Sequence, residues 1–92
     1  MGDTRYIVVV FYKGIGHTLQ TDNEPRVFFS KYARLYKNLG SAIKRANELF
    51  YQYANEKVCV FKVSLDERLS CDQYNDWCKD ENRLIWDSSK WF

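Results

Sequence analysis

The chain has 92 residues, of which 46% are hydrophobic and 17% aromatic, with one proline and four glycines. This length predicts a single domain, and the aromatic content supplies enough apolar surface for a core, which excludes a disordered protein. The net charge is only +2, and no apolar run approaches the roughly 20 residues of a membrane-spanning helix. We therefore expect no membrane partner.

The cysteine content and the first residues indicate the compartment. Three cysteines, an odd number, argue against the disulfide framework of a small secreted protein. Residues 1–6 include Asp3 and Arg5 and lack the charged-then-apolar order of a signal peptide. We expect a cytoplasmic protein whose thiols are free.

The N-terminal third predicts two strands. Residues 5–13 alternate apolar side chains over both faces, which predicts a strand in the centre of a sheet. Gly14-Ile15-Gly16 predicts a turn that ends this strand, and the polar stretch to Pro25 predicts a long connection. Residues 26–32 regain strand character, and we expect them to pair with the first strand as a hairpin.

A helix follows, for which Asn38 is the expected N-cap because its side-chain oxygen can accept an unpaired N–H of the first turn. Apolar residues then recur at intervals of three and four, which predicts one buried helix face. These residues are Leu39, Ala42, Ile43, Ala46, Leu49, Phe50 and Tyr53. The helix is expected to end near residues 55–57.

The C-terminal part predicts three short elements. Residues 58–65 predict a strand, Ser70 is expected to cap a second helix that runs to about Lys79, and residues 83–87 predict a last strand. Trp91-Phe92 is expected to dock on the domain. The order β-β-α-β-α-(β) predicts an α+β fold, a small antiparallel sheet with helices on one face.

Positive charge is concentrated in the first half of the chain. Residues 1–45 carry eight Lys and Arg against three acids, whereas residues 46–92 carry six against nine. Residues 26–45 hold six bases and no acid, interleaved with aromatic residues, a pattern typical of surfaces that bind phosphates and stack on unpaired RNA bases. The alternative is a solvated face whose rings belong to the core. The predicted partner-binding residues are Arg26, Lys31, Tyr32, Arg34, Tyr36, Lys37, Lys44 and Arg45.

Metal binding and catalysis have weaker support. Cys71 and Cys78 would lie two turns apart on one helix face, and with Cys59 and His17 they could form a tetrahedral zinc site. No closely spaced cysteine pair is present, so buried thiols are the preferred interpretation, and we expect no metal and no cofactor. No nucleophile and base are paired in the sequence, which indicates a protein that is not an enzyme.

Residues 36–49, Tyr-Lys-Asn-Leu-Gly-Ser-Ala-Ile-Lys-Arg-Ala-Asn-Glu-Leu, precede the segment Val58-Cys-Val-Phe-Lys-Val63. Together with the strands before them they resemble a layout of small early proteins of tailed phages, in which a hairpin precedes a capped helix and a valine-rich strand. The resemblance covers residues 5–65 and includes no fixed functional residues. It implies a phage accessory protein in the cytoplasm of the host cell, a class that includes inhibitors of host toxins, restriction and CRISPR complexes.

Two functions stay open on these grounds. The first is an inhibitor that binds RNA or a ribonucleoprotein through residues 26–45 without turnover. The second is a protein-interaction module, or a homodimeric adapter, that blocks a host protein through a sheet edge or exposed aromatic side chains. A contiguous basic face favours the first function, and charges that are scattered or paired internally favour the second.

Overall fold

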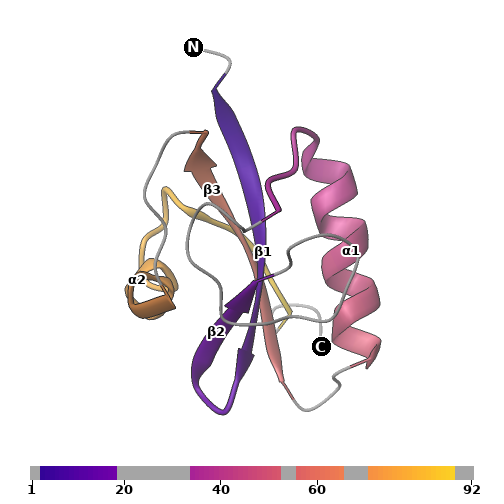
Figure 1. Cartoon of the computed structure of the whole chain (residues 1–92), viewed down its shortest axis with the longest axis vertical. Coiled ribbons are helices and arrows are strands. Elements are labelled where there is room, and N and C mark those ends of the chain that lie inside the picture. The colour runs from indigo at the N-terminus through magenta and orange to yellow at the C-terminus, as the bar shows by residue number, and fades with distance from the viewer. Residues whose placement is uncertain (1–2, 19–33, 53–55, 66–70, 89–92) are drawn as a thin grey trace.

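The computed structural model describes residues 3–18, 34–52, 56–65 and 71–88, and Figure 1 shows how their elements are arranged. These elements are β1 (Thr4–Tyr12), β2 (Ile15–Thr18), α1 (Leu39–Gln52), β3 (Lys57–Ser64), α2 (Cys71–Trp77) and β4 (Leu84–Asp87). The predicted α+β class, antiparallel sheet and order of elements are confirmed. Neither helix has the length and hydropathy required to span a bilayer.

The sheet has the strand order β2-β1-β3-β4, and each neighbouring pair is antiparallel. β1 pairs with β3 along eight residues, from Thr4 opposite Ser64 to Phe11 opposite Lys57. β4 is shorter and pairs with β3 only as far as Phe61, where the register shifts. The predicted central position of β1 is confirmed.

The hairpin partner of β1 differs from the prediction. A two-residue turn, Lys13-Gly14, joins β1 directly to β2, and both turn residues have positive φ angles, 53° and 82°. Positive φ at both positions is typical of a type I′ turn, whose twist matches that of paired strands. Residues 15–18 are therefore a strand rather than a polar connection. The strand predicted for residues 26–32 lies outside the described residues.

The two helices cover opposite faces of the sheet, which corrects the expectation that both lie on one face (Figure 1). The core under α1 contains Val8, Val10, Tyr36, Ala42, Ala46, Leu49, Val58, Val60 and Trp86. The core under α2 contains Ile7, Val9, Phe11, Cys59, Phe61, Val63, Tyr74 and Trp77. Because β1 and β3 are apolar on both sides, each face has to be removed from water.

The predicted cap of α1 is confirmed. The side-chain oxygen of Asn38 accepts hydrogen bonds from the backbone N–H groups of Gly40 (2.8 Å) and Ser41 (3.3 Å). Such bonds satisfy donors that the first turn of a helix leaves unpaired. Ala42, Ala46 and Leu49 are fully buried against the sheet, as their spacing predicts.

α2 is confirmed as a short helix, although its predicted cap, Ser70, is outside the described part of the chain. Tyr74 of this helix is 1% exposed, and its ring stacks on Phe61 with centroids 6.2 Å apart. Gly16 of β2 lies directly beneath this ring, because a Cβ atom built on Gly16 would be 2.7 Å from Cδ2 of Tyr74. The absence of a side chain at Gly16 therefore allows α2 to approach the sheet.

We expect Gly16→Ala to lower the free energy of unfolding by about 1–3 kcal/mol, the usual range for overpacking a core. The ring of Tyr74 cannot shift easily, since Trp77 also contacts it with centroids 5.4 Å apart. Urea denaturation would measure the change. The control is Ile15→Val, whose half-exposed side chain should change stability by less than about 0.5 kcal/mol. Equal stability of the two variants would contradict the packing of α2 on β2.

Candidate functional site

The structure describes five of the eight predicted partner-binding residues. Arg34, Tyr36 and Lys37 precede α1, and Lys44 and Arg45 lie in its second turn. The other three, Arg26, Lys31 and Tyr32, lie outside the described residues. Of the five, Arg34, Lys37 and Lys44 are exposed, whereas Tyr36 and Arg45 are not.

Tyr36 belongs to the core and does not offer a ring for base stacking, which corrects its predicted role. Its backbone pairs with Tyr6 of β1 through two hydrogen bonds of 2.9 and 2.8 Å, and its side chain is 9% exposed in the core under α1. The guanidinium carbon of Arg34 lies 5.0 Å from the centre of the Tyr36 ring. The edge of β1 beyond β2 is thus occupied by the segment that leads into α1.

Arg45 is also a poor candidate for a phosphate ligand. Its side chain is 21% exposed, and its Nη1 lies 3.7 Å from Oε2 of Glu48, one turn further along the same helix. Part of its charge is therefore compensated within α1. Arg45 is therefore not counted among the residues of the site.

Lys37 and Lys44 are exposed and flank the start of α1. Lys37 lies just before the N-cap Asn38 and Lys44 lies in the second turn, so both are within about two turns of the start of α1. No acidic residue is present in the first turn of α1, and the N-terminus of a helix has a partial positive charge of its own. The two ammonium groups and the helix terminus therefore all contribute positive charge near the start of α1.

Lys62 of β3 joins this group, although it lies outside the basic segment of residues 26–45. Tyr6 pairs with Tyr36 on one side and with Lys62 on the other, which places Lys62 about 10 Å from Tyr36 across two strand spacings. Lys62 is exposed and lies two residues beyond Val60, on the α1 face of the sheet. The signal in the sequence was a lysine that follows Val58 and Val60 on the α1 face of β3.

We call the four cations Arg34, Lys37, Lys44 and Lys62 the basic end. They come from a loop, a helix and a strand that meet where β1 begins and α1 starts (Figure 1). Among the ion pairs formed within the described ranges, none includes Lys37, Lys44 or Lys62. These three charges are therefore available to an external anion.

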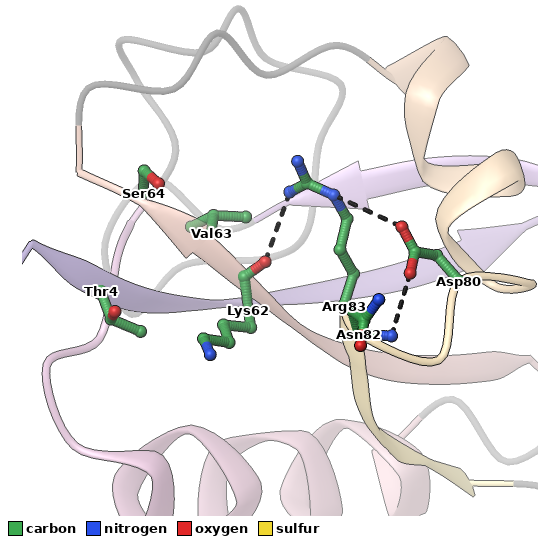
Figure 2. A pocket seen from close by; sticks show the side chains of 7 residues that line it. All are labelled: Thr4, Lys62, Val63, Ser64, Asp80, Asn82 and Arg83. Carbon is green, nitrogen blue, oxygen red and sulfur yellow. Dashed lines mark hydrogen bonds and ion pairs between the residues drawn. The ribbon is translucent and has the colours of Figure 1, made fainter.

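An open cavity of about 330 Å³ adjoins Lys62 where β3 extends past the start of β4. Figure 2 shows its lining: Thr4, Lys62, Val63, Ser64, Asp80, Asn82 and Arg83. Arg83 is held in place, because its Nη1 donates to the carbonyl oxygen of Lys62 (3.4 Å) and its Nε lies 3.8 Å from Oδ2 of Asp80. Its guanidinium also lies 4.4 Å from the Trp77 ring centre.

Of the residues considered for zinc, the side chain of Cys71 lies outside the described part of the structure, and the other three do not all come together. His17 pairs with Val10 and so lies on the α1 face, where its Nδ1 is 2.7 Å from the carbonyl oxygen of Ile15. Cys59 and Cys78 belong to the α2 face. Within the described part of the chain, no group of three His, Cys, Asp or Glu residues is arranged to hold a metal ion.

A second polar cluster surrounds Cys59 beneath α2. Burial raises the pKa of the Cys59 thiol far above its ordinary value of 9.0, and the charge of Asp87 and the neighbouring Cys78 add to this effect. Nζ of Lys57 lies 3.6 Å from Oδ2 of Asp87. Burial acts to lower the pKa of Lys57, but the carboxylate of Asp87 contributes to raising it above 10.5. Cys59 therefore stays a neutral thiol.

We expect Cys59 to make the folded state less stable at alkaline pH. An unfolded chain ionises this thiol near pH 9.0 and the folded chain does so only at higher pH, so the stability present below pH 9 is lost as the pH rises. The free energy of unfolding can be measured by urea denaturation in reducing buffer from pH 8 to about 10. It should fall more steeply with pH in the natural protein than in Cys59→Ala, by up to about 1.4 kcal/mol per pH unit. Parallel curves would contradict the burial of this thiol.

Comparison with protein-family models, curated proteins and solved structures gives no match for this chain.

Proposed function

We propose that the protein binds the phosphate backbone of RNA, free or within a ribonucleoprotein, through the basic end. We propose further that binding alone, without catalysis, is how it acts. The observation that carries the proposal is the position of Lys37, Lys44 and Lys62. These exposed ammonium groups come from the loop before α1, the second turn of α1 and β3, and the first turn of α1 has no acid. Several exposed cations at one end of a domain suit a chain of phosphates.

The chemistry of the basic end favours backbone contacts over base stacking. Tyr36 is buried, and the described aromatic side chains with the largest exposure, Tyr12 and Tyr51, lie near the hairpin turn and the end of α1. Phosphate contacts fix position but carry little sequence information. We therefore propose recognition of structured RNA by its shape and charge.

The resemblance of residues 5–65 to small early proteins of tailed phages supports a biological setting for this binding. We propose that the protein antagonises a host defence system whose active component contains RNA. Occupation of an RNA surface would block such a complex without turnover, which agrees with the absence of a paired nucleophile and base in the sequence.

A protein-interaction module is the alternative function, and one observation favours it. Tyr12 and Ile15 face each other across the hairpin and are 44% and 51% exposed. An exposed apolar pair of this kind contributes to protein contacts. This pair lies at the opposite end of β1 from Thr4 and the basic end, so the two functions depend on separate residues.

The salt dependence of RNA affinity tests the proposal. Fluorescence anisotropy with a short labelled RNA hairpin should give a plot of log K against log salt concentration with a slope of about −2 to −3, as expected when three phosphates are neutralised. A pull-down from bacterial lysate should lose its captured material after nuclease treatment. No RNA binding at low salt, together with capture that resists nuclease, would favour the protein-interaction module.

A further inference from the structure

Two cysteines from different elements belong to the core beneath α2. Cys59 lies in β3 and is 0% exposed, whereas Cys78 directly follows the end of α2 and is only partly buried. The Cys78 thiol donates to the carbonyl oxygen of Tyr74 at 3.4 Å, and the ring of Tyr74 stacks on Phe61 of β3. Cys78 is therefore on the side of α2 that packs against the sheet.

The neighbouring residues show that the two thiols are close together. Cys78 lines an open cavity of about 450 Å³ with Phe11 and Lys57, which face each other across β1 and β3. Cys59 follows Lys57 by two residues, so its side chain leaves β3 on the same face. Burial is the main cause of the raised pKa of Cys59, and a hydrogen bond with the Cys78 thiol contributes to it.

Cys78 is the thiol that a small oxidant in solution reaches first. The cavity beside it has room for hydrogen peroxide, which is little larger than water. Cys59 is fully buried and stays a neutral thiol, and the thiolate is the form that reacts readily with peroxides. Oxidation would thus begin at Cys78, with Cys59 held next to the oxidised sulfur.

We propose that Cys78 is a site of oxidation by peroxides and that Cys59 converts the oxidised form into an intramolecular disulfide. In the first step the Cys78 sulfur attacks one oxygen of hydrogen peroxide, the O–O bond breaks, and a sulfenic acid and one water form. In the second step the Cys59 sulfur attacks the sulfenic sulfur and the S–O bond breaks. The hydroxyl group leaves with the Cys59 proton as a second water. The two thiols lose two electrons, which the peroxide gains.

Proximity is what allows the buried Cys59 to take part in the second step. Sulfenic acids condense with a neighbouring thiol, and a group held in position reacts as if its concentration were very high. The product joins the short helix α2 to the centre of the sheet by a covalent bond. This inference does not depend on RNA binding.

The test treats the full-length natural protein with a small molar excess of hydrogen peroxide and measures its intact mass. The mass should fall by about two daltons, the two hydrogen atoms lost, and return after reduction with dithiothreitol. Peptide mapping without reduction should find Cys59 joined to Cys78. Cleavage before Asp72 and Asp76 separates Cys78 from Cys71, so the map identifies which of the two is linked.

Cys71→Ser is the matched control, because it removes the third cysteine and should keep the mass loss. Cys78→Ser, at a partly exposed position, should abolish the loss while the circular dichroism spectrum stays unchanged. Cys59→Ala should leave the sulfenic acid of Cys78 without its partner, so that dimedone traps at least about tenfold more adduct than in the natural protein.

Three results would overturn the inference. The first is a natural protein that loses no mass under peroxide. The second is a disulfide that includes Cys71 or joins two chains. The third is an equal yield of dimedone adduct in the natural protein and in Cys59→Ala.

Discussion

Replacing Ala46 by glutamate is expected to destabilise the protein strongly at neutral pH. Ala46 is 0% exposed and lies in the core between α1 and the sheet. A carboxylate at this position would be buried without a partner, which costs at least about 3 kcal/mol in proteins. That cost is a large part of the roughly 5–15 kcal/mol that stabilises a small domain. Circular dichroism and urea denaturation would measure the loss.

Asn47→Glu is the matched control, because it introduces the same residue at the next position in the chain, which lies on the exposed side of α1. Its free energy of unfolding should stay within about 0.5 kcal/mol of that of the natural protein. The comparison separates burial of the carboxylate from any change in helix propensity. If Ala46→Glu melts at the same temperature as Asn47→Glu, the face by which α1 contacts the sheet is assigned wrongly.

Reversal of two charges at the basic end, Lys37→Glu with Lys44→Glu, is expected to abolish RNA binding while the fold stays intact. Both side chains are exposed and form no ion pair within the described residues, so their removal breaks no contact that stabilises the structure. Each glutamate removes one favourable phosphate contact and adds a repulsive one. Affinity for an RNA hairpin at low salt should fall by at least about a hundredfold, or about 2.7 kcal/mol. Single alanine variants should each weaken binding less.

The control for this pair is Lys13→Glu with Lys79→Glu, which changes the net charge by the same amount elsewhere. Lys13 is exposed in the hairpin turn, and Lys79 is exposed after α2, which covers the opposite face of the sheet. A general electrostatic attraction would respond equally to both double variants. RNA binding that persists in Lys37→Glu with Lys44→Glu, or that is lost equally in the control, would exclude the basic end as the binding surface.

Local patterns in the sequence determined most of the elements. The cap at Asn38 and the spacing of Ala42, Ala46 and Leu49 are properties of a single helix, and the structure confirms them. β1 and β3 were predicted because their β-branched and aromatic residues alternate over two apolar faces. The same two apolar faces show why the helices lie on opposite sides of the sheet, a consequence that the order of elements alone does not reveal.

The site was predicted only in part, because a linear charge pattern does not distinguish a free cation from a compensated one. Lys37 and Lys44 are exposed as expected, but Arg45 faces Glu48 and Tyr36 pairs with Tyr6 in the core. Lys62 is 25 residues away from Lys37 in the chain and reaches the basic end only because β3 pairs with β1. Composition and periodicity thus determined which residues form each helix and strand, since those preferences depend on neighbours in the chain. Strand pairing and packing decided which charges lie together on the surface, since those contacts form between residues far apart in the sequence.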